Sequence, residues 1–131
     1  MQEVYDFLKK CKTYYLATVE DGQPRVRPFG TVDIFEGKLY IQTGKSKDCF
    51  RQMMANPKVE ICAFNGAGEW LRVAATAVND DRVEPKAHLL DQYPHLKANY
   101  DPADANTAVL YLKDAVATFS SFTAPSRVVT F

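Results

Sequence analysis

Two short stretches of the chain carry the residue types that proteins use to bind a phosphate group. The first, "DGQPRVRPFGTV" (21–32), places Arg25 and Arg27 two residues apart in a segment with the composition of a strand. The second, "QTGKSK" (42–47), combines two lysines with two hydroxyl side chains. Guanidinium, ammonium and hydroxyl groups all donate hydrogen bonds to phosphate oxygens. Together the two stretches are a candidate anion site.

The arginine pair is informative because charged side chains are rarely buried without a partner. Strand residues alternate between the two faces of a sheet, so Arg25 and Arg27 share one face. Pro28 follows them and cannot donate a ladder hydrogen bond, which is typical of a sheet edge or of backbone beside a ligand. We expect both arginines to face a bound anion. A solvated edge strand is the alternative.

The second stretch lies where a strand is expected to end and a helix to begin, with Ser46 as the predicted N-cap. The first turn of a helix has unpaired N–H groups and attracts phosphate. Thr43 and Ser46 add hydroxyl donors, and Lys45 and Lys47 add positive charge. Alone, the motif also fits a capped helix with solvated lysines. If the two flanking strands are hairpin neighbours, both stretches converge on one dianion.

Periodicity predicts the elements that position these residues. Apolar residues at helical spacing predict helices over 3–11, after Ser46, and over 84–100 with a break near Pro94. Alternating stretches bounded by turn residues predict strands at 13–20, 24–35, 38–43, 58–64, 69–80 and 108–122, the last one bent near Lys113 and Asp114. A short strand at 127–131 is a further candidate. These elements predict a mainly β (α+β) fold: one domain, 1–131, built as a six-stranded antiparallel barrel with two to three flanking helices.

Composition excludes several classes of protein. The 131 residues include sixteen basic and sixteen acidic ones, and this zero formal charge argues against nucleic-acid binding. No apolar run has transmembrane length, and the first ten residues are not typical of a signal peptide, so we expect no membrane partner. Cys11, Cys49 and Cys62 form no CxxC pair. Reduced thiols indicate a cytoplasmic protein.

Few other residues suggest chemistry. Trp70, the only tryptophan, fits a core or interface anchor and is also able to stack on a flat aromatic ligand. His88 and His95 lie seven residues apart without a Cys or Glu at ligand spacing, so we expect no metal site. No Ser or Cys stands with a His and a carboxylate in a nucleophile pattern, so no catalytic side chain is assigned.

The chain resembles the FMN-binding split-barrel family related to pyridoxamine 5'-phosphate oxidase, in its short single-domain form. The resemblance rests on an ordered set of stretches: "LATVEDGQPRVRPFG", "GKLYIQTGKSKD", "ANPKVEICAF", "EWLRVA" and "YPHLKANYDPADANTAVLYLKDAVATF". It covers nearly the whole chain. It implies a split barrel, an FMN cofactor, and a homodimer with its flavins in the interface.

The resemblance also implies which residues hold the cofactor. Arg27 and Lys47 match the family's phosphate-binding arginine and lysine, with Arg25 as a second arginine on the same face. The other implied flavin contacts are Val26, Pro28, Gln42, Thr43, Ser46 and Trp70. Backbone of the arginine strand and Trp70 would lie against the flavin ring, and the remaining residues would close around the phosphate and ribityl chain.

The implied function is an FMN-dependent oxidoreductase that passes electrons between a donor such as a reduced nicotinamide and a small-molecule substrate, since the flavin carries the redox chemistry. No lysine stands in "PFGTVDIF", where pyridoxamine 5'-phosphate oxidases bind substrate, so that particular reaction is not expected. The alternatives are a non-catalytic binder of flavin or haem, a deazaflavin-using protein, and a barrel that binds single-stranded nucleic acid. The zero net charge disfavours the last.

Overall fold

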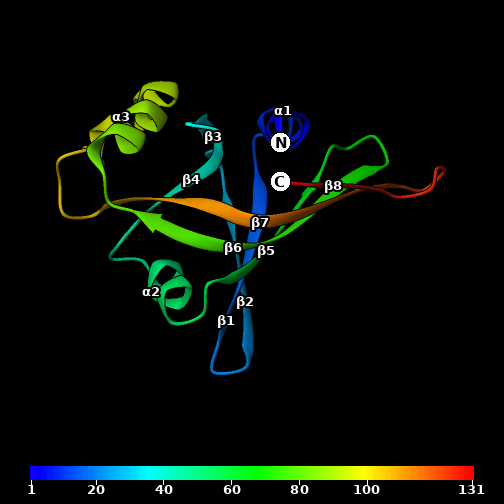
Figure 1. The fold of residues 1–131 in the computed structure, drawn as a ribbon, viewed down its shortest axis with the longest axis horizontal. Helices are drawn as coiled ribbons and strands as arrows, with labels where there is room; N and C mark the ends of the chain where they lie inside the picture. The colour runs from blue at the N-terminus through cyan, green and yellow to red at the C-terminus, as the bar shows by residue number, and fades with distance from the viewer.

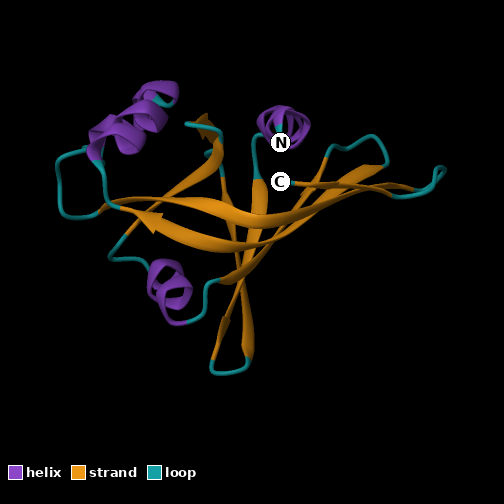
Figure 2. Cartoon of the chain, in the orientation of Figure 1, coloured by secondary structure: helices purple, strands orange, loops and turns teal.

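One strongly curved antiparallel sheet forms the body of the protein, with helices above and below it (Figures 1 and 2). The computed structural model describes every residue from Met1 to Phe131. Its strands are β1 (Tyr14–Glu20), β2 (Gln23–Phe29), β3 (Asp33–Phe35), β4 (Lys38–Gly44), β5 (Lys58–Phe64), β6 (Glu69–Asp80), β7 (Thr107–Ser121) and β8 (Arg127–Thr130). Its helices are α1 (Gln2–Cys11), α2 (Asp48–Ala55), α3 (Val83–Gln92) and the 3-10 helix η1 (Pro94–Ala98).

The order of the strands explains why the sheet curls. Hydrogen-bonded neighbours follow the path β2-β1-β5-β6-β7-β4-β3, with β8 added beside β7. The two edge strands of this path, β2 and β3, are consecutive in the chain and are joined only by residues 30–32. So short a connection spans at most about 14 Å, which forces the two edges to approach each other. The sheet therefore closes into a split barrel, with no ladder between β2 and β3.

The predicted fold class is confirmed, and the strand count is corrected. The segment 24–35, predicted as one strand, breaks at 30–32 into β2 and β3, and β8 forms at the C-terminal end, which gives eight strands. The hairpin partner of β4 is β3, so the condition that the strands carrying Arg27 and Thr43 are hairpin neighbours is not met. The predicted bend in β7 is present: Asp114 has a φ of 52° and the pairing with β6 shifts register there.

The barrel interior holds a hydrophobic core of 21 buried residues. Most of them come from the strands, and the rest come mainly from the inward faces of α1 and α2. Val4 and Leu8 of α1 belong to it. Each such buried aliphatic side chain contributes roughly 1.5–3 kcal/mol. Met53 and Gln52 bury the inner face of α2, which packs beside β1. None of the helices combines the length and apolar character needed to cross a membrane.

Candidate functional site

Two adjoining cavities lie between β2, the β4–α2 connection and the neighbouring helices. The larger, about 540 Å³, is called the α2 cavity; its lining is Glu20, Arg25, Val26, Arg27, Lys47, Asp48, Cys49 and Gln52. The smaller, about 240 Å³, is called the η1 cavity; its lining is Arg27, Pro28, Phe29, Gly30, Thr31, Gln42, Thr43, Lys47, Cys49, Tyr93, His95, Leu96 and Tyr100. The two cavities meet at Arg27, Lys47 and Cys49.

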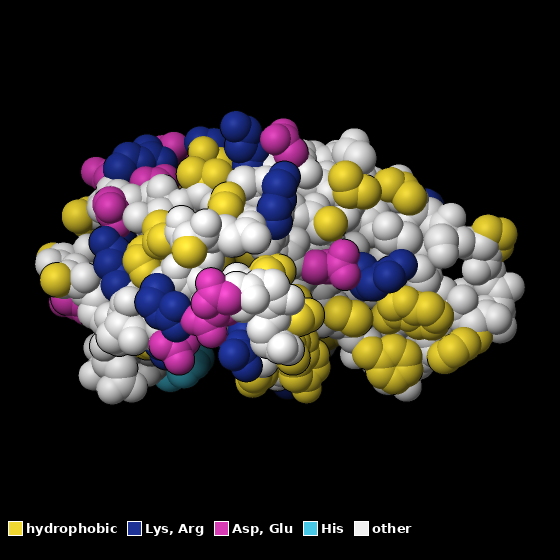
Figure 3. All heavy atoms as spheres, turned by 90° about the horizontal axis from the view of Figure 1, so that it is seen from below, with side chains coloured by type: hydrophobic (Ala, Val, Ile, Leu, Met, Phe, Trp, Pro, Cys, Tyr) yellow, Lys and Arg dark blue, Asp and Glu magenta, His cyan; other side chains and the backbone are white.

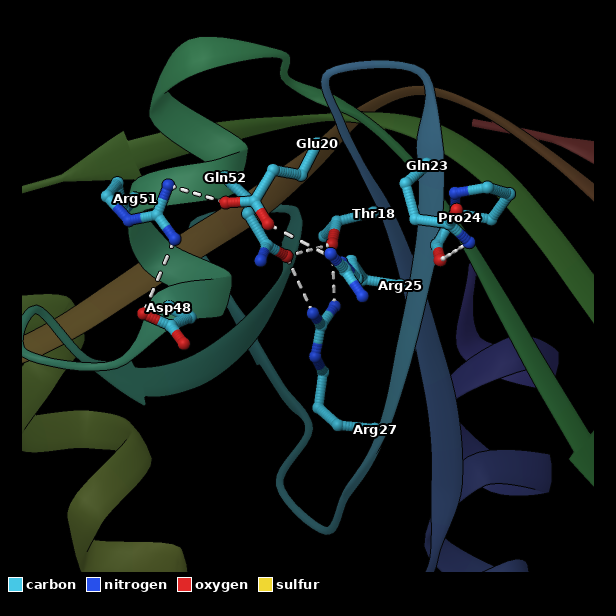
Figure 4. Close-up of polar contacts among 9 residues, drawn as sticks. All are labelled: Thr18, Glu20, Gln23, Pro24, Arg25, Arg27, Asp48, Arg51 and Gln52. Carbon is cyan, nitrogen blue, oxygen red and sulfur yellow. Dashed lines mark hydrogen bonds and ion pairs between the residues drawn. The ribbon is translucent and has the colours of Figure 1, made fainter.

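The Arg27 guanidinium is fixed between the two cavities by neutral acceptors only (Figure 4). Its Nη1 donates to Thr18 Oγ1 at 2.8 Å and to the Leu16 carbonyl oxygen at 3.3 Å. Its Nη2 donates to Gln52 Oε1 at 2.7 Å. No carboxylate lies within ion-pair distance of Arg27, so its positive charge is held in place without being neutralised. Such a group is suited to bind an anion.

Arg25 shares the face of Arg27, as alternation predicts, but it has an acidic neighbour. Its Nε lies 3.4 Å from Glu20 Oε1, while Arg51 Nη1 lies 2.7 Å from Glu20 Oε2 (Figure 4). Arg51 also lies 3.4 Å from an Asp48 oxygen. Hydrogen bonding from Arg51, with a smaller contribution from Arg25, lowers the pKa of Glu20. Glu20 therefore stays ionised and tethers the β1–β2 hairpin to α2.

The charges around the α2 cavity favour a dianion. Three cations and two carboxylates line it: Arg25, Arg27, Lys47, Glu20 and Asp48. Both carboxylates also contact Arg51, which lies outside the lining, whereas Arg27 and Lys47 have no ion-pair partner in the chain. A phosphate monoester carries about −1.5 to −2 at neutral pH. The two cations without an ion-pair partner, Arg27 and Lys47, thus match the charge of the group that the sequence motifs predict.

Two details of the lysine-containing stretch were predicted wrongly. The helix begins at Asp48 with Lys47 at the N-cap position, so Ser46 is not the cap. A turn precedes the helix, in which the Lys47 amide donates to the Gly44 carbonyl oxygen. This turn moves Ser46 away from the N-cap position, and the Ser46 amide donates to Asn106 Oδ1 instead. Lys45 turns outward to Asp81, 2.8 Å away. Lys47 is the lysine of this stretch that reaches both cavities.

The other predicted contacts divide between three places. Pro28, Gln42 and Thr43 line the η1 cavity, where Thr43 Oγ1 and Cys49 Sγ share a hydrogen bond of 3.3 Å. Val26 borders the α2 cavity, although most of its side chain is exposed. Trp70 lies elsewhere, in a cavity of about 410 Å³ beside α1, with its ring against Phe122. One copy of the chain does not bring Trp70 to Arg27.

Several residues at the site were missed by the sequence analysis. Thr18 and Gln52 are polar residues on otherwise apolar inward faces of β1 and α2, and this break in the pattern is the signal that was available. Tyr93 has no comparable signal. Its hydroxyl donates to the Val32 carbonyl oxygen and accepts from the Val32 amide and from Lys9, which fixes the β2–β3 connection.

The fold defines this molecule as a split-barrel protein. The family model described as "Pyridoxamine 5'-phosphate oxidase" matches residues 1–119, and the chain belongs to this family. No curated protein gives a significant match.

Solved structures extend the comparison. A NimC/NimA family protein from Clostridium acetobutylicum is 45% identical, with a TM-score of 0.96, and the alignment covers 100% of this chain and 92% of that one. A pyridoxamine 5'-phosphate oxidase-related, FMN-binding protein from Nostoc punctiforme is 14% identical, with a TM-score of 0.66 and coverage of 99% and 95%. A haem-binding protein from Mycobacterium smegmatis is 13% identical, with a TM-score of 0.68 and coverage of 94% and 57%. The last two share the fold.

Proposed function

We propose that the protein is an FMN-binding flavoprotein, and that it uses the flavin to transfer electrons to or from a small molecule. The observation that carries this proposal is that Arg27 and Lys47 line one cavity without an ion-pair partner, while both carboxylates of that cavity are engaged by arginines. A dianionic phosphate is the ligand group that uses this arrangement best. The fold likeness to an FMN-binding protein from Nostoc punctiforme supports the same choice.

The residues present fit this cofactor. Arg27 and Lys47 would hold the phosphate, helped by the amides of Asp48 and Cys49 at the start of α2, which have no backbone acceptor. The η1 cavity adds an aromatic and apolar wall of Phe29, Tyr93 and Tyr100, suited to exclude water from a flat ring. When bound, the flavin supplies the hydride or electron chemistry. The protein's part is to hold and orient it.

We also propose that the protein is a homodimer with the flavin at the interface. The outward faces of β1 and β2 expose Tyr15, Val19 and Val26, at 51%, 37% and 68% of their surface. Pro28 pairs with Tyr15 on this face, and Phe64 of β5 is 56% exposed beside Trp70. Hydrophobic side chains gather at the lower centre and right of Figure 3. So large an exposed apolar area favours a partner surface.

The dimer accounts for Trp70 as well. Because this ring lies outside both cavities of its own chain, its implied flavin contact requires a second copy. The three cysteines are all unpaired, which supports the proposed cytoplasmic location.

A second candidate function is the storage or sensing of a flat cofactor without catalysis, with haem as the alternative ligand. Two observations favour it: His95 lines the η1 cavity, and the fold is shared with a haem-binding protein from Mycobacterium smegmatis. Imidazole is a common haem ligand. A Soret band on haem addition, together with no uptake of FMN, would favour this candidate.

Anaerobic reduction tests the electron-transfer part of the proposal. The FMN-loaded protein is mixed with NADH or NADPH, and the visible flavin absorbance is followed before and after air or a nitro- or quinone-type acceptor is added. We expect bleaching and then recovery with multiple turnovers. If neither NADH nor NADPH reduces the bound flavin faster than it reduces free FMN, the binding role alone is supported.

A further inference from the structure

We propose that Gln52 is a direct ligand of the anion in the α2 cavity and recognises its oxygen atoms through the side-chain amide group. The inference rests on the proposed function, because the anion concerned is the phosphate group of FMN. Neither the sequence motifs nor the family resemblance points to Gln52. Its position in the structure does.

The orientation of the Gln52 amide is fixed by its neighbours. Its oxygen, Oε1, accepts hydrogen bonds from Thr18 Oγ1 at 2.5 Å and from Arg27 Nη2 at 2.7 Å (Figure 4). A guanidinium can only donate, so the atom facing Arg27 must be the amide oxygen and not the nitrogen. The nitrogen, Nε2, therefore has a defined direction away from Arg27.

Nε2 has no hydrogen-bond partner in the chain, although Gln52 is only 4% exposed and lines the α2 cavity. Buried polar groups are nearly always paired. Among side-chain polar atoms that lack a partner, Asn79 Oδ1 alone is completely inaccessible. Gln52 Nε2 therefore keeps some accessible surface, which we assign to the cavity that Gln52 lines. It presents two N–H donors to whatever occupies that space.

The available acceptor at Nε2 is a ligand, since the two nearby carboxylates are already engaged by arginines. Glu20 lies between Arg25 and Arg51, and Asp48 also contacts Arg51. An amide suits this position better than a carboxylate would. It holds Arg27 in place without neutralising it and adds donors of its own, whereas a glutamate would pair with Arg27 and repel the anion. Thr18 is then a positioning residue that acts through Gln52.

The test compares FMN with riboflavin, which lacks the phosphate group. Dissociation constants of both are measured by fluorescence titration for the parent protein, Gln52→Glu, Gln52→Leu and the control Gln92→Leu, which changes an exposed glutamine at the end of α3. Loss of a hydrogen bond to a charged group predicts roughly a tenfold to hundredfold weaker FMN binding for Gln52→Leu. Gln52→Glu should lose more, and riboflavin affinity should change by less than about threefold in either variant.

Thr18 variants separate positioning from simple structural support. Thr18→Val should lower the ratio of FMN to riboflavin affinity, and Thr18→Ser, which keeps the hydroxyl, should restore it. A purely structural role would lower the unfolding temperature of Thr18→Val and leave that ratio unchanged. Circular dichroism verifies the fold of every variant, and Gln52→Leu, with its similar volume, is the variant to rely on if Gln52→Glu does not fold.

The inference is overturned if FMN binds to the parent with a preference over riboflavin and both Gln52 variants keep that preference. A parent that takes up no FMN would defeat the proposed function instead. In that case inorganic phosphate is titrated and followed by phosphorus NMR. Binding by the parent and loss in Gln52→Leu support the phosphate ligand role, while equal binding, or no binding by either protein, overturns it.

Discussion

Arg27 and Lys47 line the same two cavities, although the strands that position them lie near opposite ends of the order of strands in the sheet. Arg27 lies on β2, the first strand of the path, and Lys47 follows β4, which is next to the other edge. The two side chains meet because residues 30–32 join the edges and roll the sheet into a barrel. The candidate phosphate site is therefore a product of barrel closure.

Replacing these two cations should remove most of the phosphate affinity. Hydrogen bonds to charged groups contribute about 1.5–3 kcal/mol each, so Arg27→Ala combined with Lys47→Ala should weaken FMN binding by at least about a hundredfold. Isothermal titration calorimetry measures the change. Lys45→Ala is the matched control, because Lys45 pairs with Asp81 and lines neither cavity. If the control and the double variant lose FMN affinity to the same extent, the phosphate is placed wrongly.

A charge on the outer face of β2 should separate the proposed dimer. Val26 is 68% exposed and pairs with Ala17 of β1, so Val26→Asp places a carboxylate in the middle of the apolar face. Light scattering after size exclusion should give a dimeric mass for the parent and a monomeric mass for the variant. Val83→Asp, on the exposed side of α3, should remain dimeric. A monomeric parent would contradict the dimer.

Acid should weaken the fold through Asp80. This carboxylate accepts from Arg82 Nη2 at 2.9 Å and from the Tyr40 hydroxyl at 2.8 Å, and hydrogen bonding by Arg82 is the main cause that lowers its pKa from 3.8 to about 2. A carboxyl with a lowered pKa binds protons less readily in the folded protein, so its stabilisation is complete above pH ~4 and is lost as the pH falls through ~2.

Asp80→Asn measures this contribution. The pKa shift corresponds to about 2 kcal/mol at pH 7 and roughly half of that at pH 3. Urea unfolding at the two pH values should therefore show a smaller difference between parent and variant at pH 3. A difference that is the same at both pH values would mean that Asp80 does not act through its charge.

Tyr93→Phe should loosen the connection between β2 and β3. The hydroxyl bonds both the amide and the carbonyl of Val32, at 3.0 and 3.1 Å, and its loss leaves these groups unpaired. We expect a loss of about 1–3 kcal/mol in the free energy of unfolding. Tyr5→Phe is the control, because the Tyr5 hydroxyl makes no hydrogen bond within the chain. An unchanged free energy of unfolding in Tyr93→Phe would contradict this role.

Local pattern was sufficient to predict most of the fold. Alternation and turn dipeptides such as Asp21-Gly22 define the strands, and both Asp21 and Gly22 adopt the positive φ that this turn needs. Pro28 was interpreted as a sign of either a sheet edge or backbone beside a ligand, and β2 is indeed an edge strand. The break at 30–32 was missed because no turn residue other than Gly30 marks it, and the pairing of β3 with β4 is decided by closure of the whole sheet.

The candidate site was only partly predictable for the same reason. Arg27 and Lys47 stand in recognisable motifs, but the groups that orient Arg27 come from the hairpin neighbour β1 and from α2, and their meeting depends on how the barrel packs. Ser46 was taken as a cap because its residue type suits one, whereas the preceding turn displaces it. Contacts such as that of Tyr93 with Val32 depend on tertiary packing, which periodicity does not describe.

Titration of the purified protein with FMN and with riboflavin, followed by visible absorbance and flavin fluorescence, tests the central claim most directly. We predict saturable uptake of FMN at micromolar concentration or below, and a preference over riboflavin of at least about a hundredfold that reports the phosphate contacts. A colourless protein that takes up no FMN at these concentrations, or one that binds both flavins equally, would contradict the account.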